Sequence, residues 1–368
     1  MIDDVDRQVE GIEPVAASSV VAPSAVAPGV AVPRVVAPTK RRFFPASPLL
    51  RGLAQGAIGV GALAYVIAKS PSNQLAAALS STRIVYLPLL FLAILVMYWL
   101  MAVRWRLILS VRDYQIRTRK LLLYYVIGTF FGNFVPGGSV STDVVRLIYV
   151  DRDVRDKAFV LTTLVYDRFM GMFALLLTGL AATLASREYL PAGAATYLTE
   201  AVFAVTLVIS AFLMSQQISA RLSRFAVYGG GKLKLQRIGN ALGRTLDAMA
   251  EIRSRKWILA STLLVSVLVR VFWTLAAYTV AVAMNLPVGL ALIFAFVSVV
   301  DLVRQLPITP NGLGLREGAL VVLFGRIGID RGQALVFSFW IFAPLVLTAI
   351  IGGIVYTLSS RVAITRGK

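Results

Sequence analysis

Long apolar runs alternate with short polar connections along most of this chain. Six runs hold few charges and are long enough to cross the roughly 30 Å hydrocarbon core of a bilayer as helices. They are residues 52–68, 84–103, 158–185, 200–219, 257–284 and 334–358. Two further apolar stretches, 121–150 and 289–325, are interrupted by Pro and Gly. The pattern predicts an all-α, polytopic integral membrane protein with about six full spans and two broken or re-entrant hairpins.

Composition agrees with a membrane protein and narrows its chemistry. Hydrophobic residues make up 58% of the chain, against about 45–50% in soluble domains. The sequence has no Cys and no His, which removes disulfides, thiolate nucleophiles, the usual zinc ligands and the commonest general base. No nucleophile elbow or zincin motif is present. We therefore expect no enzyme activity, no cofactor and no metal.

Residues 1–42 differ from the remainder of the chain. This segment is rich in Ala, Val and Pro, and its frequent prolines prevent a stable helix. Its first ten residues, MIDDVDRQVE, are acidic and lack the basic start of a signal peptide. We predict a disordered cytoplasmic tail followed by one transmembrane domain, residues 43–368.

The net charge of +19 is distributed unevenly among the connections. Segment 104–120 holds six Lys or Arg residues and 220–256 holds nine, whereas 70–83 and 186–199 hold one each. The positive-inside rule places the basic connections, and with them both termini, in the cytoplasm. It leaves open whether the broken stretches cross the membrane fully. We expect no nucleic-acid partner, since no binding module is recognisable.

The two broken stretches share a motif. The first contains NFVPGGSVSTDVVR and the second QLPITPNGLGLREGALVV. When Pro136 is aligned with Pro310, both carry Gly two places later and an acid seven places later. The aligned residues are Gly138 with Gly312 and Asp143 with Glu317. Three predicted spans separate the breaks, which puts them on opposite faces, as in an inverted repeat. Matching breaks in two halves point to a transport site near mid-membrane.

The backbone hydrogen-bonding groups at these breaks are suited to binding a ligand. Unwound backbone survives in a membrane only where protein buries it or where it lines a wet cavity. Each restarting helix presents free N–H groups and partial positive charge, which suits an anionic headgroup. Asp143 and Glu317 could instead cap these helices, as Ser141 or Thr142 could, and both alternatives stay open. GGSVSTD lacks the GK[ST] ending of a Walker loop, so phosphate hydrolysis is not expected.

Several ionisable residues lie at membrane depth, where they are costly and usually functional. Two acid–base pairs are three residues apart and share a helix face. They are Asp143 with Arg146 and Asp301 with Arg304. We interpret the second of these as a structural pair that neutralises itself.

The other charges have no obvious local partner. Arg270 lies mid-span without an acid three or four residues away, so it must pair across helices, reach the interface or face a ligand. Arg168 is similar, since the adjacent Asp167 points in another direction on a helix. Arg316 and Glu317 are adjacent at the second restart. A guanidinium binds phosphate in bidentate fashion, which makes Arg168 and Arg270 candidates for holding a headgroup.

Three segments resemble a known family. FGNFVPGGSVSTDVVR, VYDRFMGM and LPITPNGLGLREGALV are similar to the transmembrane region of the lysylphosphatidylglycerol synthase family, over about residues 43–360. That family includes the flippase half of the multiple peptide resistance factor and stand-alone bacterial and archaeal membrane proteins, one branch of which is associated with hopanoid lipids. The matching residues are Asn133, Pro136, Gly138, Asp143, Arg146, Asp167, Arg168, Pro307, Pro310, Gly312, Gly314 and Glu317. Asp167 stands where the family more often has Glu.

The resemblance implies a flippase-like domain that moves a phosphate-headed lipid, of phospholipid or polyprenyl or hopanoid type, across the bacterial inner membrane. Its partners would be anionic membrane lipids, and self-association is left open. The residues expected to meet the substrate are those just named apart from Pro307, together with Arg270 and Arg316. Lysyl transfer is not implied, because in fused members it belongs to a separate soluble domain.

Two other functions are compatible with this sequence. A membrane enzyme acting on a lipid phosphate could use Asp143, Asp167 or Glu317 as its acid or base. Neighbouring arginines would hold these carboxylates ionised and make them weak bases. A non-transporting scaffold in envelope assembly is the third alternative.

Overall fold

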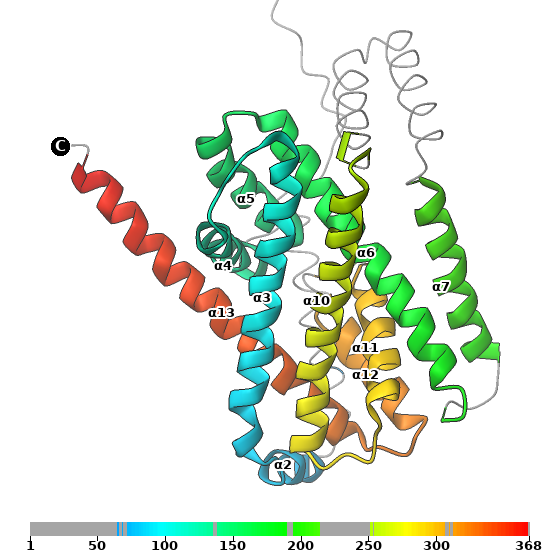
Figure 1. Ribbon diagram of the computed structural model, residues 1–368. Coiled ribbons are helices and arrows are strands. Elements are labelled where there is room, and N and C mark those ends of the chain that lie inside the picture. Colours follow the sequence, from blue (N-terminus) through cyan, green and yellow to red (C-terminus); the bar gives the residue numbers. More distant parts are fainter. Residues whose placement is uncertain are drawn as a thin grey trace, which may run out of the picture. The chain divides into compact units, whose positions relative to one another are not determined.

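The computed structural model describes residues 65, 68, 72–134, 138–189, 194–213, 251–252, 254–305, 309 and 312–366. Within these ranges all regular structure is helical (Figure 1). The predicted tail, nearly all of the predicted first span and most of the 220–256 connection lie outside them. The all-α prediction is confirmed for the part of the chain that is described.

The helices follow the apolar runs closely. They are α2 (Ser72–Ser80), η1 (Ile84–Tyr86), α3 (Leu87–Leu109), η2 (Ser110–Arg112), α4 (Thr118–Phe134), α5 (Ser139–Val154), α6 (Lys157–Ala185), α7 (Ala194–Leu213), α10 (Lys256–Ala283), α11 (Leu290–Arg304), α12 (Leu315–Gly325) and α13 (Arg331–Arg366). Among the described residues, four segments are long and apolar enough to cross a membrane: Ile84–Arg112, Lys157–Ala185, Lys256–Ala283 and Arg331–Leu358. The protein is therefore a polytopic α-helical membrane protein.

α7 begins at Ala194, before the predicted residue 200, and α13 continues to Arg366, beyond the predicted residue 358. The predicted end of the 84–103 span was also wrong, with consequences for the site. The span predicted as 84–103 continues to Leu109, because Trp105, Ile108 and Leu109 are fully buried and keep the helix in the bundle. Arg104, counted above among the charges of a connection, thus lies inside α3 and is itself buried.

Each broken stretch forms two short helices between two long ones. Residues 121–150 become α4 and α5, and 289–325 become α11 and α12. These helices have 17, 16, 15 and 11 residues, fewer than the roughly 20 of a full span. Their lengths favour the re-entrant alternative over two full crossings.

The helix contacts are those that an inverted repeat predicts. The units α3–α6 and α10–α13 each consist of a long helix, a broken hairpin and a long helix. α3 packs against α10, and these are the first long helices of the two units. α4 packs against α13 and, in the same way, α11 packs against α6. The first helix of each broken hairpin thus contacts the last long helix of the other unit. The backbone N–H of Arg83 donates to the carbonyl of Ala283 at 2.8 Å. This bond joins the start of α3 to the end of α10, so these two helices are antiparallel (Figure 1).

Small residues allow close packing between the halves. A Cβ atom on Gly352 of α13 would lie 2.0 Å from the carbonyl oxygen of Val126 on α4. A Cβ atom on Gly179 of α6 would lie 2.6 Å from the ring of Phe203 and 3.0 Å from Ser298. Such contacts are typical of helices that associate in lipid, where backbone approach replaces the hydrophobic driving force.

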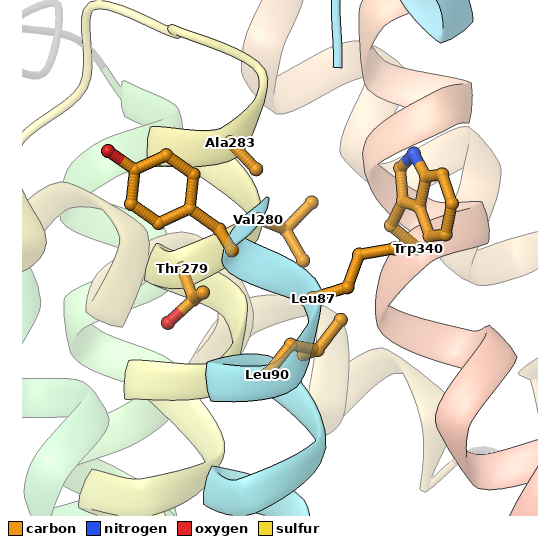
Figure 2. A pocket seen from close by; sticks show the side chains of 7 residues that line it. Leu87, Leu90, Thr279, Val280, Ala283 and Trp340 are labelled. Carbon is orange, nitrogen blue, oxygen red and sulfur yellow. The ribbon is translucent and has the colours of Figure 1, made fainter. Parts of the chain in front are cut away.

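A small apolar recess lies between α3, α10 and α13 (Figure 2). Its lining is Tyr86, Leu87, Leu90, Thr279, Val280, Ala283 and Trp340. None of these side chains is charged, so the recess is chemically unlike a headgroup pathway.

Candidate functional site

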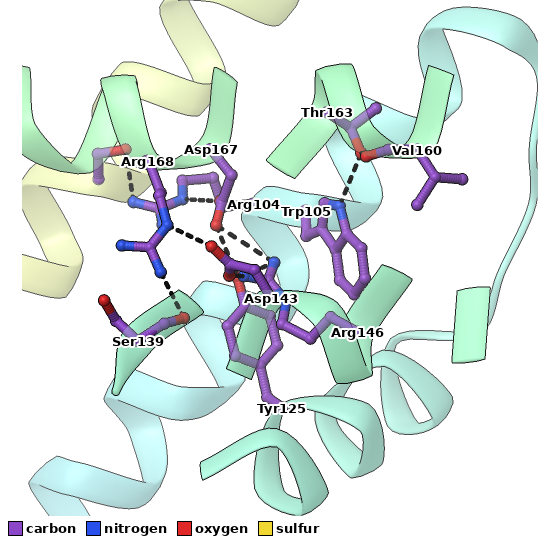
Figure 3. A network of polar contacts seen from close by, with 11 residues as sticks. Arg104, Trp105, Tyr125, Ser139, Asp143, Arg146, Val160, Thr163, Asp167 and Arg168 are labelled. Atoms are coloured by element: carbon purple, nitrogen blue, oxygen red, sulfur yellow. Dashed lines mark hydrogen bonds and ion pairs between the residues drawn. The ribbon is translucent and has the colours of Figure 1, made fainter. Parts of the chain in front are cut away.

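The first charge cluster is centred on Asp167 of α6, which is only 2% exposed. Arg104 Nε lies 2.7 Å from its Oδ1, and the Tyr125 hydroxyl donates to its Oδ2 at 2.9 Å. Arg146 Nη2 approaches the same oxygen at 3.2 Å. Together with Asp143 and Arg168, these residues form what we call the Asp167 cluster (Figure 3). Its members are Arg104, Tyr125, Asp143, Arg146, Asp167 and Arg168.

Arg146 is held by aromatic rings as well as by charge. Its guanidinium carbon lies 4.1 Å from the ring centre of Trp105 and 3.8 Å from that of Tyr125. Its Nη2 also donates to the Tyr125 hydroxyl at 2.6 Å. Cation–π contact and hydrogen bonding together replace the hydration that a buried guanidinium loses.

Asp143 connects this buried centre to the surface. Arg146 Nη1 lies 3.2 Å from one carboxylate oxygen of Asp143, and Arg168 Nε donates to the other. Arg168 also donates to the carbonyl of Ser139 at 2.7 Å. Its side chain is 44% exposed, so the cluster ends at an accessible guanidinium beside the first turn of α5 (Figure 3).

Asp143 lies one turn inside α5, whose N-cap residue Gly138 has no side chain to cap it. This Gly138 has φ of +54°, a conformation that favours glycine. Asp143 is therefore engaged in ion pairs with Arg146 and Arg168.

The second charge cluster, which we call the Asp301 cluster, consists of Arg270, Trp273, Asp301 and Arg304. Arg270 Nη1 and Trp273 Nε1 reach Asp301 Oδ2 at 2.6 and 2.8 Å. Arg304 Nη1 lies 3.1 Å from Oδ1, so the i,i+3 pair forms. Of the alternatives for Arg270, the structure shows pairing across helices, from α10 to α11.

Glu317 closes the start of α12. Its carboxylate accepts the backbone N–H of Gly314 at 2.7 Å, Arg316 Nε at 2.9 Å and the Ser338 hydroxyl at 3.1 Å. Gly312 has φ of +73°, and a Cβ there would lie 2.6 Å from Arg304 Cγ. For Glu317, the structure therefore shows the capping alternative.

The remaining predicted positions are only partly described. Gly314, the N-cap of α12, has φ of +80°. Asn133, on the last turn of α4, donates to the carbonyl of Thr129 at 2.8 Å. Pro136 and Pro310 lie outside the described residues.

Comparison with known families identifies this architecture. The family model of the lysylphosphatidylglycerol synthase TM region matches residues 52–353. The chain belongs to this family. Neither a curated protein nor a solved structure matches it.

In this member of the lysylphosphatidylglycerol synthase TM family, sequence reasoning missed several residues that belong to the two clusters or contact the predicted site residues. They are Arg104, Trp105, Tyr125, Trp273 and Ser338. A signal existed for Arg104, since the apolar residues that follow it continue the helical run. The aromatic and hydroxyl partners carry no signal, because such residues are common in any apolar helix.

The buried charge networks of the two halves of this chain carry the same balance of charge. Arg104, Arg146 and Arg168 face Asp143 and Asp167 in the first half. In the second half, three arginines again accompany two carboxylates: Arg270, Arg304, Arg316, Asp301 and Glu317. Each of these networks is thus left with one excess positive charge, which suits an anionic ligand.

Proposed function

We propose that this protein is a lipid translocase that moves a phosphate-headed lipid across the bacterial inner membrane without changing it chemically. The carrying observation is the exposed Arg168, which continues into a buried network with excess positive charge. A phosphate enters where this guanidinium and the first N–H groups of α5 are both accessible.

The carboxylates support transport rather than catalysis. Asp143, Asp167, Asp301 and Glu317 each contact at least one arginine. A carboxylate committed to such a pair is a weak general base. Its use is to hold arginines in place within a membrane, which lets the arginines meet a substrate.

The distribution of exposed charge supports an orientation with both termini in the cytoplasm. Arg112 pairs with Asp156 at 3.0 Å and with Glu251 at 2.7 Å, and Lys120 pairs with Asp153 at 2.6 Å. These contacts gather the ends of α3 and α5 and the starts of α4 and α6 into one strongly charged end. The positive-inside rule assigns that end to the cytoplasm.

The test is lipid movement in reconstituted vesicles. Phosphatidylglycerol with a fluorescent acyl chain is quenched from outside, and the fraction that becomes accessible is followed over time. Arg168→Ala removes a charge-assisted contact of about 1.5–3 kcal/mol and should slow movement by about ten- to a hundredfold. Arg270→Ala should also slow movement, with some loss of stability because Asp301 loses a partner.

Arg119→Ala is the matched control, since Arg119 is exposed at the start of α4 and outside both clusters. It should move lipid at the wild-type rate. Movement at the wild-type rate in Arg168→Ala would remove that residue from the mechanism. Lipid recovered with altered mass would favour the enzyme alternative, and a wild-type protein without either activity would favour a scaffold.

A further inference from the structure

A buried polar stripe runs along one face of α10. It consists of Thr262, Ser266, Arg270 and Thr274, spaced four residues apart and therefore aligned on the helix. All four are buried, although α10 is otherwise apolar enough to span the membrane. A polar row inside an apolar span is costly and requires a reason.

The stripe joins the two charge clusters. Arg104 of the Asp167 cluster donates from Nη1 to the Ser266 hydroxyl at 3.1 Å. One turn further along α10, Arg270 pairs with Asp301 at 2.6 Å. Four residues correspond to an axial rise of about 6 Å. The two halves of the repeat, which bring their own arginines and carboxylates, thus meet on a single helix.

Two polar atoms of the stripe are not satisfied by hydrogen bonds. Arg270 Nε and Thr274 Oγ1 are buried and have no hydrogen-bond partner within the described part of the chain. Buried polar groups are almost always satisfied, so such an exception needs an explanation. Both atoms are on one helix face, a turn apart, where they could donate to a ligand that the halves share.

Small residues of α6 lie beside this stripe. A Cβ on Gly171 would be 3.4 Å from Arg104 Nη1, and a Cβ on Gly179 would be 3.0 Å from Ser298. Ser298 in turn accepts a long hydrogen bond of 3.5 Å from Arg270 Nη2. At these two points α6 itself contributes no side chain, although the ring of Phe203 packs beside Gly179.

We propose that Ser266, Arg270 and Thr274 form the track along which the lipid phosphate passes from one cluster to the other. This inference rests on the proposed translocase function and adds its path. A phosphate leaving Arg104 next meets Ser266, then Arg270 and Thr274, so it stays hydrogen-bonded while the acyl chains remain in lipid. Arg270 Nε and the Thr274 hydroxyl, which have no partner among the described residues, donate hydrogen bonds to the phosphate as it passes.

Thr274→Val tests the track with almost no change in side-chain shape. If Thr274 is merely structural, losing an unpartnered buried hydroxyl should leave stability unchanged or raise it, and lipid movement should stay the same. If the track exists, movement of fluorescent phosphatidylglycerol should fall about fivefold or more while the melting temperature holds, because a donor to a charged group is lost.

Thr279→Val is the matched control on the same helix. Its hydroxyl donates to the carbonyl of Leu275 at 2.8 Å, and its side chain lines the apolar recess instead of the stripe. It should move lipid at the wild-type rate. Equal rates for Thr274→Val and the wild type would overturn the track.

Ser266→Ala provides a second variant, with the half-buried Ser261→Ala as its partner control. Slower movement in Ser266→Ala alone would support the track, and equal rates in both would count against it. The two proposals fail in different ways. A wild-type protein that moves no phosphatidylglycerol overturns the translocase and the track together. Loss in Arg168→Ala with full activity in Thr274→Val and Ser266→Ala overturns the track alone.

Discussion

The Asp167 and Asp301 clusters each neutralise a buried aspartate, but they differ in how exposed their arginines are. Each holds an aspartate between two arginines, with an aromatic side chain donating a third hydrogen bond: the hydroxyl of Tyr125 in one and the indole N–H of Trp273 in the other. The Asp167 centre is dry, because its arginine partners have side chains only 3–5% exposed. The Asp301 centre is more open, with arginine side chains 11–20% exposed.

The acids that align in the two motifs have also diverged. Asp143 links a buried arginine to the exposed Arg168. Glu317 accepts the backbone N–H of Gly314 and fixes the start of α12. The two halves thus share the backbone break, whereas the acid at the restart links two arginines in one half and caps the helix in the other.

The largest expected effect separates the two centres. Asp167→Asn leaves the buried Arg104 without its carboxylate partner and leaves Arg146 with Asp143 alone. It should destabilise the protein by about 3–5 kcal/mol. Asp301→Asn should cost less, because its partners are nearer solvent. Thermal unfolding in detergent compares the two variants. A larger loss in Asp301→Asn would refute the contrast between a dry and an open centre.

The next effect concerns the two glycines that align after the breaks. Gly312→Ala should cost more than the roughly 1–2 kcal/mol of left-handed strain, because its Cβ also meets Arg304. Gly138→Ala should cost only the strain of its backbone, about 1–3 kcal/mol for φ of +54° with ψ of −129°. Its Cβ meets nothing within 4 Å among the described atoms. Melting temperatures of the two variants rank them, and equal values would argue that Arg304 moves aside.

Tyr125→Phe should destabilise the protein by about 1.5 kcal/mol, since its hydroxyl bonds both Arg146 and Asp167. The neighbouring Tyr124→Phe is the control. Its hydroxyl donates to Asp153 at 3.0 Å, near the charged end where water can replace it. Denaturation curves should separate the two variants, and a larger loss in Tyr124→Phe would contradict the buried network.

The smallest effect tests the cap. Ser338→Ala removes one of several donors to Glu317 and should cost about 1 kcal/mol. It should leave lipid movement unchanged, because Glu317 has a structural role here. Slowed movement with an unchanged melting temperature would show that the second half also handles substrate directly.

Much of the fold could be predicted from the sequence, and the reasons are local. Apolar runs marked α6, α10 and α13 to within a few residues at most of their ends, because hydrocarbon penalises each polar residue individually. Glycine marked the breaks, because positive φ is cheap only without a Cβ. The end of α3 was misjudged at Arg104, where a single charge resembled the start of a connection.

The pairing of charges could not be predicted in this way. Arg270 gave no sign that Asp301, 31 residues away, would be its partner. Arg104 and Asp167 are 63 residues apart. The sequence gives the order of their two helices along the chain, but it does not show which faces of these helices meet. The Tyr125 hydroxyl contacts Arg146 and Asp167 only because the packing of α4 places it beside them.

By itself, the sequence determined an all-helical membrane protein with two related breaks and a set of charges placed inside its spans. Those properties depend on the cost of each residue in hydrocarbon and on local backbone freedom, which neighbours along the chain report. Only the tertiary structure decided which arginine neutralises which carboxylate, which arginine stays exposed, and that one face of α10 joins both halves. Ion pairing acts over a few ångströms in space, and helix packing alone brings distant residues within that range.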